Sequence, residues 1–360
     1  MIAEVHRRAA LLAGAEVVGV LAADAAQTQA AAARWGCPGL SGLEDLAALK
    51  PDVMHVCSPN AVHAEHVRAA LGSGAHVICE KPLATNESDA QALVAEAAAL
   101  GRVTAVPFVY RFHPLVREIR ARRQNGDFGA WQLLHGSYLQ DWLVNPNATS
   151  WRVDSRQGGP SRAFADIGSH WCDLMEFVTD ERIAQVMAAF TITVPERPAV
   201  SQVSFSGAAA EGPKVKVDTE DAAIVLFRTA SGVLGSVVIS QVSAGRKNRL
   251  WFEFDGAKQS AVFDQENPET VWLGSEEGAQ ILNRSPGQGA PDARRLSSLP
   301  PGHAQGYAQC FENFVADTYA VVRGEPREGL PNFTDGLRAA RIIDAVIASA
   351  QSGAWADVAA

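Results

Sequence analysis

One lysine follows directly on a predicted buried segment, a position where its surroundings can make it reactive. In AHVICEKPLAT (75–85) an apolar run is followed by Glu80, Lys81 and Pro82. Burial and a neighbouring charge can shift the pKa of such a lysine, so Lys81 could act as an acid or a hydrogen-bond donor toward a substrate. An ordinary ion pair with Glu80 at the strand end is the alternative interpretation.

A second segment, FADIGSHWCDLMEF (164–177), carries polar residues at helical spacing. Asp166, His170 and Asp173 fall at i, i+4 and i+7, on one face that borders an apolar stripe. A half-solvated histidine there could exchange protons near neutral pH. The alternative is that Asp166 caps the helix and His170 is a satisfied structural residue. We expect no metal, because a zinc site would lack a third ligand and a cysteine pair.

A third segment, CSPNAVHAEH (57–66), ends one apolar run and starts a helical pattern. Ser58, Pro59 and Asn60 would place free backbone N–H groups and an amide side chain at the junction. A simple capping turn followed by surface histidines is equally compatible with this segment.

Alternating elements must position these three segments. We predict strands at 15–23, 52–59, 75–82 and 102–110, separated by helices at 24–36, 60–74 and 86–101. This alternation is typical of βαβ units and a parallel sheet. Because ligands bind beyond the carboxyl ends of such strands, SPN, EKP and VYRFHP should share one crevice.

The pattern changes after about residue 125, where strand pairs replace the alternation. Residues 217–242 predict two strands joined at Ser231-Gly232, and 249–265 predict a hairpin that bends at Asp255-Gly256. We expect a helix near 166–179, a surface loop at 284–302, and helices near 303–323 and 333–351. The predicted α/β fold has a first domain with a parallel sheet (1–125) and an α+β domain with a mainly antiparallel sheet (126–360). Its C-terminal helix would pack back on the first domain.

Composition excludes several classes of protein. The formal net charge is -9, without a basic run, so no nucleic-acid partner is expected. Five scattered cysteines without a C-x-x-C pair indicate reduced thiols and a cytoplasmic location. We find neither a signal peptide nor an apolar run near the roughly 18 residues of a membrane span.

Together the three segments resemble the Gfo/Idh/MocA oxidoreductases. The likeness covers nearly the whole chain and is carried by Glu80-Lys81-Pro82 and, further on, GGPSRAFADIGSHWCD (158–173). It implies that the first domain is a dinucleotide-binding Rossmann domain with NAD or NADP as cofactor. It also implies that the sheet of the second domain is open and that the substrate is a carbohydrate or polyol. It also implies a homo-oligomer, dimer or tetramer, formed through the free face of the sheet.

The resemblance implies roles for individual residues. Lys81 would contact the reacting hydroxyl and stabilise the developing oxyanion, His170 would be the general acid/base, and Asp166 would orient His170 or the substrate. Substrate neighbours would be Arg111, Trp151 and Arg152. The residues expected at the cofactor are Ile2, Ala22, Ser58, Pro59, Asn60, His63, Glu80 and Lys81.

Two departures from the family pattern concern the cofactor. In IAEVH (2–6), Ala3 would stand where the last residue of G-x-G-x-x-A belongs, so we expect the first strand and its glycines to lie upstream of Met1 rather than to have been lost. Ala22 stands where an acidic residue often binds the ribose of NAD. NAD and NADP therefore both remain open.

The expected function is hydride transfer between NAD(P) and a hydroxyl-bearing carbon of a sugar, a polyol or a sugar derivative. A non-catalytic sensor of the same fold, and an NAD-assisted glycosidase or epimerase, are the alternatives. The chemistry requires Lys81 and His170 to meet at one alcohol group, across the cleft between the two domains.

Overall fold

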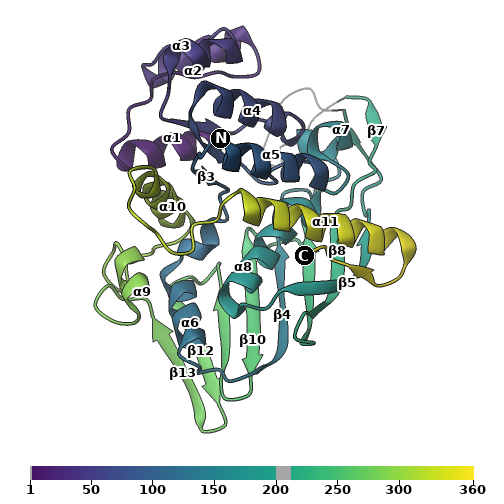
Figure 1. Cartoon of the computed structure of the whole chain (residues 1–360). Coiled ribbons are helices and arrows are strands. Elements are labelled where there is room, and N and C mark those ends of the chain that lie inside the picture. Colours follow the sequence, from purple (N-terminus) through teal and green to yellow (C-terminus); the bar gives the residue numbers. More distant parts are fainter. Residues whose placement is uncertain (1, 200–211) are drawn as a thin grey trace. The chain divides into compact units, whose positions relative to one another are not determined.

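Two compact units make up the chain, and the computed structural model describes residues 2–199 and 212–360 (Figure 1). The first unit comprises Met1–Pro107 and Phe311–Ala340, and the second comprises Phe108–Cys310 and Arg341–Ala360. Residues 108–125 thus lie in the second unit. The domain boundary that we place near residue 125 from the sequence stays a prediction.

The first unit contains a parallel sheet with helices. Its strands are β1 (Val53–Val56), β2 (His76–Cys79) and β3 (Thr104–Ala105), in the order β1-β2-β3. Val53 pairs with His76, and Val56 with Cys79. The helices that begin in this unit are α1 (Ile2–Leu12), α2 (Ala25–Trp35), α3 (Leu46–Leu49), α4 (His63–Ser73), α5 (Glu87–Ala99) and α11 (Phe333–Ser352), and it also holds most of α10 (Tyr307–Val322).

Short capping signals explain why these helices begin and end where the sequence predicts. The side chain of Asp24 accepts a hydrogen bond from the Gln27 amide at the start of α2, and Asn86 accepts one from the Asp89 amide at the start of α5. Gly36 ends α2 in the left-handed conformation, which glycine adopts without steric cost.

Two strand predictions in the first unit are wrong. Residues 15–23 contribute only one bridge, between Val20 and Gly39, and none of them is buried. An apolar run becomes a strand only where a neighbouring strand pairs with it, and here that pairing is a single bridge. The strand predicted at 102–110 is confined to β3, because Pro107 has no N–H for a ladder and residues Val109–Phe112 turn into a 3-10 helix.

A nine-stranded mixed sheet dominates the second unit. Its order is β13-β12-β11-β10-β4-β9-β8-β5-β14, and only the β4–β9 pair is parallel among the described pairs. The strands are β4 (Trp131–Leu139), β5 (Ile183–Thr191), β8 (Ala222–Thr229), β9 (Leu234–Ser240), β10 (Arg249–Gly256), β11 (Ser260–Asp264), β12 (Thr270–Ser275), β13 (Gly278–Asn283) and β14 (Ala356–Asp357). A separate pair, β6 (Glu196–Pro198) and β7 (Lys214–Lys216), is antiparallel.

The two predicted turns in this unit had different outcomes. Residues Ser231 and Gly232 lie between β8 and β9, with Gly232 at φ 96°, as predicted. The bend predicted at Asp255-Gly256 is wrong, because Asp255 still pairs with Ser260 across β10 and β11. Gly256 is needed for another reason, since a Cβ there would come within 2.3 Å of the Phe128 carbonyl oxygen.

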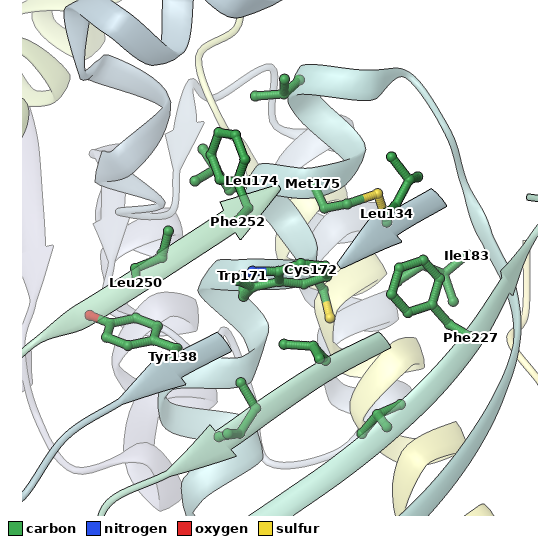
Figure 2. Close-up of a cluster of buried hydrophobic side chains, with 14 of the residues drawn as sticks. Leu134, Tyr138, Trp171, Cys172, Leu174, Met175, Ile183, Phe227, Leu250 and Phe252 are labelled. Atoms are coloured by element: carbon green, nitrogen blue, oxygen red, sulfur yellow. The ribbon is translucent and has the colours of Figure 1, made fainter. Parts of the chain in front are cut away.

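The core of the second unit lies on one face of the large sheet. Leu134, Phe227 and Phe252 point from the strands toward Trp171 and Met175 of the helix that follows the FADIG segment (Figure 2). The helices of this unit are α6 (Pro114–Gln124), α7 (Ser155–Gly158), α8 (Ser169–Thr179), α9 (Pro291–Leu296) and the second half of α11. Helix α9 falls inside the segment predicted to be a loop, 284–302.

The opposite face of this sheet is exposed in the single chain. Side chains alternate along each strand, so Ala223, Val225 and Phe227 of β8 are buried while Ile224 is 56% and Leu226 47% exposed. Apolar side chains of neighbouring strands continue this open face: Leu133, Met187, Leu234 and Val238.

Among the helices of the described residues, none is long and apolar enough to span a membrane.

Candidate active site

The predicted site residues fall into two groups, one in each compact unit. Ile2, Ala22 and the segments at 58–63 and 80–81 belong to the first unit, and Arg111, Trp151, Arg152, Asp166 and His170 belong to the second. Each group is described by itself. The meeting of Lys81 and His170 at one alcohol stays a prediction.

Two of the first-unit segments follow neighbouring strands at the same edge of the sheet. Strand β1 ends at Val56, two residues before Ser58, and β2 ends at Cys79, directly before Glu80 and Lys81. Because β1 and β2 are parallel neighbours, both segments leave the carboxyl edge side by side. The Lys81 backbone N–H donates to Glu80 Oε2 at 3.3 Å, and the Lys81–Pro82 peptide bond is cis.

His63 joins these two strand ends. Its ring is fully buried, with Nδ1 2.8 Å from the Pro82 carbonyl oxygen and Nε2 2.9 Å from the Ser58 carbonyl oxygen. Burial, the largest effect, lowers the pKa of His63 against the raising effect of the two carbonyls. The alternative of surface histidines in this segment is therefore wrong for His63, because both of its ring nitrogens contact backbone carbonyl oxygens.

The same edge offers groups that suit a dinucleotide. The hydroxyl of Ser58 is buried and, within residues 2–199 and 212–360, has no hydrogen-bond partner. A buried polar group without a partner is costly, so a ligand that satisfies it would be favoured. The residues present here therefore fit a bound nicotinamide cofactor. Ala22 lies further along the unit, where its N–H donates to Thr28 Oγ1 at 3.0 Å before α2, and Ile2 begins α1.

Asp166 of the second unit lies in a π-helical turn, Phe164–Gly168, that leads into α8. Such turns often occur at functional sites. Its carboxylate accepts a hydrogen bond from Gln241 Nε2 at 2.9 Å and lies 3.5 Å from Arg152 Nε. The capping alternative is wrong for Asp166, because the first N–H groups of this segment donate to other side chains, Phe164 to Glu220 Oε1 at 2.8 Å and Ala165 to Ser161 Oγ at 3.2 Å. Gly168 is required for the turn, since a Cβ there would come within 2.6 Å of the Phe164 ring.

His170, in the first turn of α8, lies among aromatic rings and is partly exposed. The centroids of Tyr110, Phe108 and Tyr138 are 5.5, 5.7 and 6.4 Å from its own. Tyr110 and Tyr138 share a hydrogen bond of 2.7 Å between their hydroxyls, and both bond to the amide of Asn248. Burial raises the pKa of Tyr110 to about 12, so its hydroxyl stays protonated at neutral pH.

The three predicted substrate neighbours have different surroundings. The Arg152 guanidinium lies over the Trp151 ring, 4.3 Å from its centroid, and its Nε lies 3.5 Å from the Asp166 carboxylate. Arg152 therefore lies between Trp151 and Asp166. Arg111 is buried and forms a two-pronged pair with Asp173, with Nε 2.8 Å from Oδ2. The pairing favours a structural role for Arg111, while Trp151 and Arg152 lie beside the candidate site.

Several residues of the two groups were missed by the sequence reasoning. Gln241 ends β9 and reaches Asp166, and Tyr138 of β4 reaches His170. Tyr110 belongs to the VYRFHP segment, which we predicted to lie at the ligand edge of the sheet. That predicted position is the one feature of the sequence that could have identified Tyr110. In the first unit the buried His6 and its neighbour His55 were also missed.

Comparison with protein families identifies two matches that together cover most of the chain. Residues 1–108 match an oxidoreductase family with an NAD-binding Rossmann fold, and residues 116–262 match the GFO/IDH/MocA C-terminal domain. The levoglucosan dehydrogenase of Pseudarthrobacter phenanthrenivorans is 33% identical over 321 residues, which cover 85% of this chain and 80% of that protein. The D-glucoside 3-dehydrogenase of Escherichia coli is 35% identical over 45% of this chain and 46% of that protein.

Solved structures resemble the chain over nearly its whole length. A levoglucosan dehydrogenase in complex with NADH and L-sorbose has a TM-score of 0.87 and 28% identity, covering 99% of this chain and 94% of that one. An inositol dehydrogenase homolog from Azotobacter vinelandii, complexed with NAD+, has a TM-score of 0.87 and 26% identity over the same shares.

Proposed function

Because the chain belongs to the Gfo/Idh/MocA oxidoreductases, we propose that it is an NAD(P)-dependent dehydrogenase that oxidises a secondary hydroxyl of a sugar or polyol. The observation that carries the proposal is that the candidate cofactor residues follow two adjacent strands, while the candidate acid/base lies on a helix. Ser58, Glu80 and Lys81 leave adjacent parallel strands at the edge where dinucleotides bind, and His170 stands among aromatic rings that suit a sugar ring.

The cofactor, when bound, would exchange the hydride with the substrate. Side chains of the protein would bind the cofactor and the substrate and transfer the proton. Ser58, Pro59, Asn60 and Glu80 would line the nicotinamide and its ribose, and Ile2, Ala22 and His63 would lie near the dinucleotide or support its site. NADH and NAD+ occur in the complexes of the relatives named above, which favours NAD over NADP.

Proton transfer falls to the second group. His170 would take the proton of the reacting hydroxyl as general base, while the Lys81 ammonium stabilises the negative charge that develops on the oxygen. Asp166 would orient the substrate or His170, because Gln241 and Arg152 hold its carboxylate in place. Trp151 and Arg152 would contact the sugar.

The substrate class follows from the relatives. Levoglucosan dehydrogenase and D-glucoside 3-dehydrogenase are named for pyranose-derived substrates, and we propose a pyranose or its anhydro form here. Net formation of NADH or NADPH, followed at the absorbance of the reduced nicotinamide, would be measured with glucosides, levoglucosan and inositol. Turnover with one of them supports a dehydrogenase, whereas sugar or cofactor binding without net reduction would favour a sensor or an NAD-assisted glycosidase or epimerase.

We also propose that copies of the chain assemble through the open face of the nine-stranded sheet, in the cytoplasm. Exposed apolar side chains such as Ile224, Leu226 and Val238 are typical of a protein interface. None of the five cysteines forms a disulfide in the part of the chain that the structure describes, which suits a reducing compartment.

Sedimentation analysis of Ile224→Glu tests the proposed interface. A charge buried in an apolar interface costs several kcal/mol, so this variant should sediment as a smaller species than the wild-type dimer or tetramer. Leu12→Glu, on an exposed residue of α1, is the matched control and should leave the assembly unchanged. A wild-type monomer, or an unaltered Ile224→Glu oligomer, would contradict the proposed interface.

A further inference from the structure

A connected set of buried and half-buried titratable groups adjoins Glu80 in the first unit, and the chemistry proposed above does not use it. His6 of α1 is 2% exposed. Its Nε2 lies 2.9 Å from Glu80 Oε1, and its Nδ1 lies 2.8 Å from Nδ1 of His55, a residue of β1. The other ring nitrogen of His55 lies 2.9 Å from the hydroxyl of Tyr319 on α10.

The geometry restricts where the protons can be. Two ring nitrogens at 2.8 Å need one proton between them, and the carboxylate of Glu80 can only accept. Two assignments satisfy every ring nitrogen of the set. In one, a doubly protonated His6 donates to Glu80 and to His55, and a neutral His55 donates from Nε2 to Tyr319. In the other, both rings are neutral, His55 donates to His6, and the Tyr319 hydroxyl donates to Nε2 of His55. His6 donates to Glu80 in both.

The local charges favour the assignment in which His6 is a cation. Burial disfavours the cation of His6, but interactions with Cys57 and then with Glu80 outweigh it and raise the pKa of His6 to about 10. Burial, followed by the positive charge of His6, lowers the pKa of His55 well below its ordinary value. The groups that face His6 are thus His55, Cys57 and Glu80, with Phe311 of α10 packed edge-on at 4.7 Å between ring centroids.

We propose that His6 is a positioning residue that holds Glu80 and, through it, the loop that carries Lys81. Glu80 Oε1 is anchored by His6 while Oε2 receives the backbone N–H of Lys81 at 3.3 Å. The next residue, Pro82, is anchored by His63 through its carbonyl oxygen. The loop is therefore held from α1 and from α4, on both sides of Lys81.

The cation has a second consequence for the ligand. A positive charge on His6, 2.9 Å from Glu80 Oε1, would oppose the negative charge of Glu80 at the cofactor edge. This inference rests on the proposed function for the roles of Glu80 and Lys81, but the charge state of His6 can be measured without any turnover.

The first experiment is ¹⁵N NMR of the histidine side chains in the full chain at pH 8. Ordinary histidines are neutral at that pH. We expect one imidazolium signal in the wild type that is absent from His6→Gln and present in His66→Gln, the same substitution on a half-buried residue of α4. If every histidine is neutral at pH 8, the charge-assisted form of the His6–Glu80 contact is overturned, and only the NADH-binding measurement below decides the positioning role. Should His6→Gln fail to fold, the wild-type titration still decides, because the signal must persist until about pH 10.

The second experiment is a double-mutant cycle on NADH binding, followed by nicotinamide fluorescence. Loss of a charge-assisted hydrogen bond predicts a roughly tenfold weaker Kd for His6→Gln and for Glu80→Gln. Because the two residues act as a pair, the double variant should be no worse than the poorer single variant. Additive losses would overturn the pairing, as would a His6→Gln with wild-type Kd and wild-type kcat. A wild-type chain that binds NADH but reduces no NAD with sugars would refute the proposed function alone.

Discussion

Two buried histidines, one in each compact unit, have pKa values that are shifted in opposite directions. His6 of the first unit faces a carboxylate and a neighbouring ring nitrogen, and its pKa is raised to about 10. His113 of the second unit caps α6, where its Nδ1 accepts the Leu115 N–H at 3.2 Å and its ring packs 4.8 Å from that of Phe263. Burial lowers the pKa of His113 to about 3. Equal burial thus gives a fixed cation or a fixed neutral ring, according to the partners.

His170, which we propose for proton transfer, has different surroundings from both. It is only partly buried, and the rings of Phe108, Tyr110 and Tyr138 lie around it. A catalytic histidine must exchange its proton with the substrate during turnover, which requires that its ring is accessible.

The largest effect is expected from removing the proposed catalytic groups. His170→Ala and Lys81→Ala should each lower kcat by about 10²–10⁴-fold, the usual contribution of a positioned acid/base or oxyanion group. The measurement is steady-state NADH formation, with circular dichroism to confirm that each variant folds.

His113→Asn is the matched control for this comparison. Asparagine can cap α6 as His113 does, so its kcat should stay within a few-fold of the wild type. A His170→Ala enzyme with near-wild-type kcat would contradict the proposal that His170 transfers the proton during turnover.

A smaller effect is expected on the pH dependence of stability. The pKa of His113 is depressed in the folded chain, so its contribution to the free energy of unfolding is present above pH 6.5 and is lost as the pH falls toward 3. Between pH 7 and pH 4 the wild type should lose about 2–3 kcal/mol more than His113→Asn, as measured by urea unfolding.

The opposite pH dependence is expected for His6. Its folded pKa is raised, so its contribution is complete below pH 6.5 and is lost as the pH rises toward 10. The wild type should therefore lose more stability than His6→Gln between pH 7 and pH 9.5. Parallel stability curves for a variant and the wild type would mean that the histidine in question has the same charge in the folded and unfolded chain.

The sequence predicted the elements that local signals define. Asp24, Asn86 and Gly36 mark helix ends by their own chemistry, and Ser231-Gly232 marks the turn between β8 and β9. The strand expected at 15–23 failed, because an apolar run does not show whether a partner strand is present.

The candidate site was predictable only in part, for a similar reason. Motifs located Lys81, Asp166 and His170, since each lies in a short segment with a recognisable pattern. The π-helical turn at Asp166 depends on how Phe164 packs against Gly168, which spacing alone does not indicate. The contacts of His6 with His55 and Glu80 join residues far apart in the chain, and only the folded unit brings them together.

The most direct test of the central proposal is a crystal structure of the chain with NADH and a sugar that it oxidises. We expect Lys81 Nζ and a ring nitrogen of His170 to lie within about 3.2 Å of the same sugar hydroxyl. A bound sugar that leaves either group too far from that hydroxyl for a direct or water-bridged hydrogen bond would contradict the proposed chemistry.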